Sequence, residues 1–288
     1  MCGIFGCVSR DAEVAPIIHA ALKRLEYRGY DSVGIATVHG GKIYIKKDEG
    51  KIDQVHRIHN LDDLPGSIGV GHTRWATHGA PYQANAHPHT DCNDEIAVVH
   101  NGIIENFAEL KTELENSGHK FRSKTDTEVI PHLIEENMRK GLGLLEATRE
   151  ALKRLKGSYA IAVISIHEPE KIICARMESP LVLGVGKDAV YCASDIPAFL
   201  PLTNRAVIIE NGELAILQAD GYEIRSLEDW RLIQREPEII EWTADMAEKQ
   251  GYPHFMLKEI HEQPVSEEYS QITGPVPQPH GNLPRSGR

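Results

Sequence analysis

The chain opens with Met1-Cys2-Gly3-Ile4-Phe5-Gly6, and residues 3–9 form an apolar run typical of a first β-strand. Because cysteine is small, we expect removal of Met1, which would leave a thiol and an α-amine together on Cys2. An α-amine titrates near ~7.7–8.0, so it can act as a general base for the thiol beside it. The alternative is a buried, inert cysteine, since free cysteine often packs as a small hydrophobe.

The pattern beyond this strand predicts sheets covered by helices. Apolar residues at helical spacing predict helices over 13–25, 105–116, 126–139 and 143–155. Strands are expected at 33–39 and 42–47, joined across Gly40-Gly41, and at 67–74, 95–100, 158–166, 171–176, 181–186, 189–193, 206–210 and 213–218. Since helices and strands do not alternate regularly, we expect mainly antiparallel sheets in an α+β layered architecture.

Composition narrows the class of protein. A net charge of -11 argues against a nucleic-acid binder or a protein of anionic membrane surfaces. No apolar run approaches the ~20 residues of a membrane span, and we expect no secretory signal. The five cysteines are odd in number and form no CxxC pair, which favours reduced thiols and a cytoplasmic location. We expect Cys7, Cys174 and Cys192 to be core residues.

Three further segments are dense in chemically active residues. The first is Leu25-Glu26-Tyr27-Arg28-Gly29-Tyr30-Asp31-Ser32. The second is His72-Thr73-Arg74-Trp75-Ala76-Thr77-His78-Gly79, with Asn85-Ala86-His87-Pro88-His89 after it. The third is His100-Asn101-Gly102-Ile103-Ile104-Glu105-Asn106, followed by Ser123-Lys124-Thr125-Asp126-Thr127-Glu128.

Together with Cys2, these segments resemble the amino-terminal-nucleophile glutamine amidotransferases, or class II glutaminases. The match is most specific to the glutaminase half of the glucosamine-6-phosphate synthase family, the glutamine–fructose-6-phosphate aminotransferases, and covers about residues 2–265. Cys-Gly-Ile-x-Gly and His-Asn-Gly recur across the class, whereas LEYRGYDS and HTRWATHG are typical of the sugar-phosphate branch. The resemblance implies a four-layer αββα sandwich of the amino-terminal-nucleophile hydrolase type.

The resemblance also implies a catalytic set. Cys2 would attack the glutamine carboxamide, and Asn101 and Gly102 would stabilise the oxyanion through a side-chain amide and a backbone N–H. Asn-Gly suits a tight turn at a strand end, and an ordinary hairpin turn is the alternative reading. Arg28 is expected to support the geometry of the nucleophile.

The same resemblance implies a substrate-binding set for zwitterionic L-glutamine. Arg74 would pair with the α-carboxylate and Asp126 with the α-ammonium group. A surface salt bridge is the alternative for Arg74, and a helix cap for Asp126. Trp75, Thr77 and His78 would line and close the pocket, although Trp75 alone is more typical of a packing aromatic.

Five histidines lie close together in the sequence and could be interpreted as metal ligands: His72, His78, His87, His89 and His100. Their spacing is not typical of zinc sites, which show tighter ligand spacings with cysteine or acidic partners. The resemblance places them on loops of the scaffold and implies a reaction that needs no metal. We therefore expect neither a metal nor a cofactor.

The predicted organisation is a glutaminase domain over 2–236, a linker over 237–270 and a disordered tail over 271–288. The linker resembles the lead into a sugar-isomerase half that does not follow, so any sugar-phosphate chemistry would need an isomerase subunit or a full-length synthase in trans. The expected reaction is hydrolysis of L-glutamine to L-glutamate and ammonia through a Cys2 thioester.

Three alternatives remain open. One is a non-catalytic glutamine-binding or regulatory form that associates with a full-length synthase. A second is an inactive fragment. The third is an enzyme with a different ammonia acceptor, such as phosphoribosyl pyrophosphate.

Overall fold

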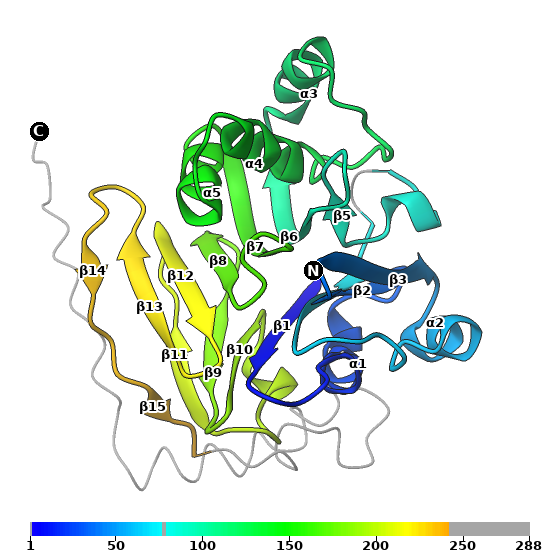
Figure 1. Cartoon of the computed structure of the whole chain (residues 1–288). Helices are drawn as coiled ribbons and strands as arrows, with labels where there is room; N and C mark the ends of the chain where they lie inside the picture. Colours follow the sequence, from blue (N-terminus) through cyan, green and yellow to red (C-terminus); the bar gives the residue numbers. More distant parts are fainter. Residues whose placement is uncertain (1, 77–78, 242–288) are drawn as a thin grey trace, which may run out of the picture. The chain divides into compact units, whose positions relative to one another are not determined.

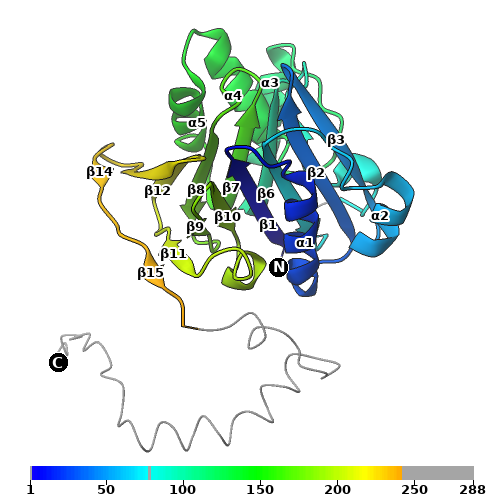
Figure 2. The same ribbon diagram turned by 60° about the horizontal axis from the view of Figure 1, so that its bottom comes forward.

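Two antiparallel β-sheets stacked face to face, with helices on their outer faces, make up the part of the chain that the computed structural model describes (Figures 1 and 2). The described residues are 2–76 and 79–241. The expected α+β class and the four-layer αββα order are confirmed.

The first sheet has eight strands and carries the amino terminus near its middle. Their order is β15 (Glu238–Ile239), β11 (Arg205–Ile208), β9 (Val182–Val185), β10 (Ala189–Ala193), β1 (Gly3–Ser9), β4 (Ile68–Arg74), β2 (Ser32–His39) and β3 (Lys42–Glu49). Gly3 pairs with Thr73, so the residue before β1 comes to lie beside the end of β4.

The second sheet has seven strands, in the order β14 (Leu232–Ile233), β13 (Gly221–Ser226), β12 (Glu213–Gln218), β8 (Ile172–Met177), β7 (Gly157–Ser165), β6 (Ile96–Ile104) and β5 (His89–Thr90). The inner faces of the two sheets share one apolar layer, in which Ile4 and Val70 of the first sheet belong with Val99 and Ala162 of the second. Alternation of side chains along each strand supplies this layer.

Helices cover both outer faces. On the first sheet lie α1 (Ala15–Leu25) and α2 (Ile52–His59), and on the second lie α3 (Phe107–Asn116), α4 (Val129–Arg139) and α5 (Leu144–Leu152). Short 3-10 turns occur at η1 (Glu26–Arg28), η2 (Gln83–Asn85) and η3 (Ile196–Ala198). Cys7, Cys174 and Cys192 are fully buried, as predicted.

Two local predictions were wrong. Asn101-Gly102 does not form a turn, because β6 runs through it to Ile104 and pairs with β7 along that whole length. Asp126 does not cap a helix, because α4 begins at Val129 with Glu128 in the cap position. The Asp126 carboxylate instead accepts a hydrogen bond from the Ile104 N–H at 2.8 Å.

The compact unit that contains the sheets ends at Glu241. Its last strand, β15, pairs with β11 beyond the expected boundary at residue 236. The expected linker from residue 242 onward and the expected tail lie outside the described residues. Among the described helices, none has the length and apolar character needed to cross a bilayer.

Candidate active site

Cys2 lies against the segment that follows β4. Its Sγ accepts a hydrogen bond from the Trp75 N–H at 3.1 Å, and the Trp75 carbonyl oxygen is 3.5 Å from the same sulfur. Burial raises the pKa of the Cys2 thiol, while the Trp75 N–H and the charge of Arg74 oppose that rise. The resting thiol is therefore protonated near neutral pH, and attack on a substrate requires a base.

Two side chains hold the Cys2 backbone. The Cys2 carbonyl oxygen accepts one hydrogen bond from Arg28 Nε at 3.1 Å and another from Asn101 Nδ2 at 3.0 Å. Arg28 is itself fixed by Asp195, whose Oδ2 lies 3.1 Å from one guanidinium nitrogen and 2.5 Å from the Tyr27 hydroxyl. These bonds link η1, β6 and the loop after β10 to the start of β1.

His72 fixes the orientation of the Asn101 amide. His72 Nε2 lies 2.9 Å from Asn101 Oδ1 and 3.0 Å from the His100 carbonyl oxygen. Both of these atoms are acceptors, so Nε2 carries the proton and donates. An amide held at its oxygen in this way must present Nδ2, with its two hydrogens, toward Cys2.

Gly102 follows on the same strand, with φ +130. A Cβ at this position would lie 2.1 Å from the Ser158 carbonyl oxygen. Only glycine fits this close approach of β6 to β7 in that conformation.

The buried Arg74 guanidinium is close enough to interact electrostatically with both the Cys2 thiol and the buried Asp126 carboxylate. Arg74 is 4% exposed and Asp126 is 5% exposed, so a surface salt bridge is excluded as the role of Arg74. Burial lowers the pKa of the Arg74 guanidinium, and the negative charges of a Cys2 thiolate, of Asp126 and of Asp31 oppose that shift. The pair offers opposite charges to a zwitterion.

Trp75 is 44% exposed and its ring meets the Tyr30 ring edge-on, with centroids 5.4 Å apart, so it is not a core aromatic. Asp31 supports the same segment, because its Oδ2 accepts a hydrogen bond from the Ala76 N–H at 2.8 Å. Thr77 and His78 lie outside the described residues.

Several supporting residues were missed at the level of sequence. His72 and Asp31 stand inside the quoted motifs, but nothing in their spacing reveals a hydrogen bond to Asn101 or to Ala76. Asp195 lies far along the chain, and only the pairing of β1 with β10 brings it near Arg28.

Four histidines pack together beside this site. The rings of His72 and His87 stack with centroids 4.1 Å apart, and His87 meets His89 at 4.7 Å. His87 and His100 each place a nitrogen within 3.0 Å of the Thr127 hydroxyl. His72 and His100 lie in strands, within the predicted ranges 67–74 and 95–100, and His89 lies in β5, whereas the resemblance implied loop positions for all three.

A family model described as a glutamine amidotransferase domain matches residues 72–201. Curated relatives include glutamine–fructose-6-phosphate aminotransferases of Methanothermobacter thermautotrophicus, 54% identical over 96% of this chain, and of Pyrococcus horikoshii, 55% identical over 92%. The alignments cover 47% and 44% of those relatives, so the chain spans about half of their length.

Solved structures agree on the fold. A glutamine phosphoribosylpyrophosphate amidotransferase from B. subtilis is 31% identical, with a TM-score of 0.67 over 79% of this chain and 50% of its own. A structure described as the allosteric regulatory enzyme of purine biosynthesis is 32% identical, with a TM-score of 0.69 over 79% of this chain and 49% of its own. Taken with the site geometry, these likenesses show that the chain contains a class II, amino-terminal-nucleophile glutamine amidotransferase domain, homologous to the glutaminase half of the glutamine–fructose-6-phosphate aminotransferases.

Proposed function

We propose that this domain hydrolyses L-glutamine to L-glutamate and ammonia, with Cys2 as the nucleophile. The observation that carries the proposal is the convergence on Cys2 of the Asn101 amide, the Arg28 guanidinium and the Trp75 N–H. A merely structural cysteine at a strand end has no need of this many polar contacts.

The chemistry follows from the protonated thiol. After removal of Met1, the Cys2 α-amine takes the thiol proton as the sulfur attacks the carboxamide carbon. The carboxamide oxygen becomes an oxyanion, which the second Nδ2 hydrogen of Asn101 and the Gly102 N–H stabilise. The ammonium group then returns the proton to the leaving nitrogen, so that ammonia departs and a Cys2 thioester remains. Water hydrolyses the thioester and releases glutamate.

Substrate selection follows from the two buried charges. The Arg74 guanidinium pairs with the glutamine α-carboxylate, and Asp126 accepts hydrogen bonds from the α-ammonium group. Trp75, the exposed aromatic beside Cys2, covers the bound amino acid.

Because the curated relatives are fructose-6-phosphate aminotransferases, we propose that this chain supplies ammonia for glucosamine 6-phosphate synthesis in the cytoplasm, together with an isomerase half or a full-length synthase. No metal or cofactor takes part in the glutaminase step.

An assay of glutamate and ammonia release tests the proposal. Protein whose amino terminus is verified as Cys2 should release both products in equal amounts, and Cys2→Ala should abolish the release. Turnover that survives in Cys2→Ala would refute it. Glutamine binding by calorimetry without product release would instead support the regulatory alternative.

A further inference from the structure

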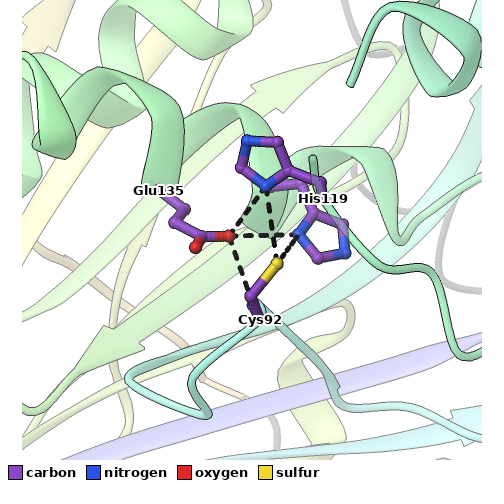
Figure 3. A group of neighbouring side chains, drawn as sticks. Cys92, His119 and Glu135 are labelled. Atoms are coloured by element: carbon purple, nitrogen blue, oxygen red, sulfur yellow. Dashed lines mark hydrogen bonds and ion pairs between the residues drawn. The ribbon is translucent and has the colours of Figure 1, made fainter. Parts of the chain in front are cut away.

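A second group of reactive side chains lies outside the candidate active site. Cys92 belongs to the loop between β5 and β6, His119 follows α3, and His132 and Glu135 lie one turn apart on α4 (Figure 3). One potential ligand atom from each of the four lies within 4.8 Å of all the others. His119, His132 and Glu135 are buried, and Cys92 is partly exposed.

The distances match the edges of a zinc tetrahedron. Zn–S bonds of about 2.3 Å and Zn–N bonds of about 2.0–2.1 Å give a sulfur–nitrogen edge of about 3.6 Å. Cys92 Sγ lies 3.6 Å from His119 Nδ1 and 3.6 Å from His132 Nδ1. Glu135 Oε2 lies 2.9 Å from His119 Nδ1 and 3.2 Å from His132 Nδ1, near the expected nitrogen–oxygen edge of about 3.3 Å.

The outer nitrogens of both imidazoles face carboxylates. His119 Nε2 lies 3.3 Å from Glu136 Oε2, and His132 Nε2 lies 3.8 Å from Glu128 Oε1. Metal-bound histidines commonly donate their second N–H to a carboxylate, which fixes the ring. Glu135 is held likewise, since Arg139 binds its other oxygen.

Hydrogen-bond counting separates a metal site from a metal-free cluster. A neutral imidazole donates from only one nitrogen, yet each of these rings faces carboxylate oxygens on both sides. Without a metal, both rings must be charged or leave a lone pair facing an acceptor. A cation bound at both Nδ1 atoms lets neutral His119 donate from Nε2 to Glu136 and lets neutral His132 turn its Nε2 proton toward the Glu128 carboxylate, 3.8 Å away.

We propose that Cys92, His119, His132 and Glu135 bind one Zn²⁺ as a structural site. The set of one thiolate, two imidazoles and one carboxylate suits tetrahedral zinc, and four protein ligands leave no open position for a substrate. The Cys92 thiol loses its proton on binding, and the charges of the thiolate and of Glu135 balance those of the ion.

The metal ties together three segments around the candidate active site. His119 and His132 stand on either side of the loop that carries Asp126 and Thr127. Cys92 lies shortly before β6, the strand that carries Asn101. Zinc would therefore hold both ends of the loop that bears the proposed ammonium-binding carboxylate. This consequence for glutamine rests on the proposed function, whereas the metal site does not.

Metal analysis of the full chain tests the site. Protein produced in zinc-supplemented medium should hold about one zinc per chain. Cys92→Ser and Glu135→Gln should lose it, and a Cys2→Ser control, which removes the other partly exposed thiol, should keep it. His56→Asn, from a second described cluster of His19, His56 and Asp62, should also keep it.

Metal titration of wild-type protein, first stripped with a chelator, tests the site without relying on the folding of a variant. Co²⁺ should give the intense visible bands of a tetrahedral ion and a thiolate-to-cobalt charge-transfer band, and Zn²⁺ should displace it and raise the Tm. Glu136→Gln should weaken zinc binding by about 10–100-fold. Wild-type protein that binds neither ion, that selects a metal other than zinc, or that loses zinc through His56→Asn but not through Cys92→Ser would overturn the proposal.

Discussion

Asn101 reaches the Cys2 carbonyl because His72 holds the other end of its amide. The bond from His72 Nε2 is buried, and it fixes which amide atom faces the nucleophile. In the proposed reaction this orientation matters more than the simple presence of an asparagine, since an oxyanion donor must be aimed before the charge develops.

Asn101→Ala should lower kcat by about 10²–10³-fold, the usual cost of one oxyanion donor, with little change in KM for glutamine. Steady-state glutaminase kinetics measure both constants. Asn106→Ala is the matched control, because the Asn106 side chain, at the start of α3, bonds the backbone of Arg154 and Lys156. An equal loss of kcat in both variants would assign the effect to folding.

Arg74→Lys should raise KM for glutamine by about tenfold or more, because lysine loses the planar fork that pairs with a carboxylate. A kcat that falls less than kcat/KM would agree with a binding role. Arg57→Lys, at an exposed position on α2, should leave both constants unchanged. An unaltered KM in Arg74→Lys would place the α-carboxylate elsewhere.

At the scale of elements, β6 and the segment before α4 supply Asn101, Gly102 and Asp126. His100, Asn101 and Gly102 lie within β6, and the Ile104 N–H at the end of this strand donates a hydrogen bond to the Asp126 carboxylate. The expectation of a turn at Asn-Gly failed because local turn propensity was outweighed by pairing with β7. The Asn-Gly dipeptide alone carries no information about pairing with a strand that lies more than fifty residues farther along the chain.

Gly102→Ala should destabilise the domain more than Gly118→Ala. Both glycines have positive φ. A Cβ at position 118 would have no neighbour within 4 Å, whereas a Cβ at position 102 would overlap the Ser158 carbonyl oxygen. The Gly118 change should cost about 1–2 kcal/mol in the free energy of unfolding. Denaturant unfolding of both variants measures the two losses in the free energy of unfolding. Equal losses would mean that the β7 backbone moves away from the new methyl group at no energetic cost.

At the scale of the whole molecule, the layered α+β class followed from the order of elements, and the helices α1, α3, α4 and α5 from apolar spacing. No element was predicted for α2, which is short and half polar, or for β13 to β15, whose residues are mostly partly exposed. The motifs located Cys2, Arg74 and Asn101. The groups that hold them, His72 and Asp195, depend on contacts across strands that no local pattern contains.

The buried histidines join the two sheets, because His72 of β4 bonds the His100 carbonyl oxygen of β6. Burial lowers the pKa of His72 to about 3 and lowers the pKa values of His87, His89 and His100 as well. These groups bind protons more readily in the unfolded chain. Their contribution to stability is therefore complete above the ordinary value of 6.5 and is lost as the pH falls below it.

The free energy of unfolding should decline between pH 6.5 and 4.5, above the range in which carboxylates take up protons. Denaturant unfolding across this window measures the slope. His87→Gln should reduce the slope by an amount that corresponds to at most about one proton taken up on unfolding. His39→Gln, at an exposed position, should leave the slope unchanged. A slope that His87→Gln does not alter would mean that His87 titrates alike in both states.

The nucleophile itself can be located chemically. Protein treated with a diazo-ketone analogue of glutamine, then digested and mapped by mass spectrometry, should carry one adduct on the sulfur of an amino-terminal Cys2. Excess glutamine should prevent the labelling. An adduct on Cys92 alone, or an unmodified Cys2 in protein that has lost Met1, would contradict the assignment of Cys2 as the nucleophile.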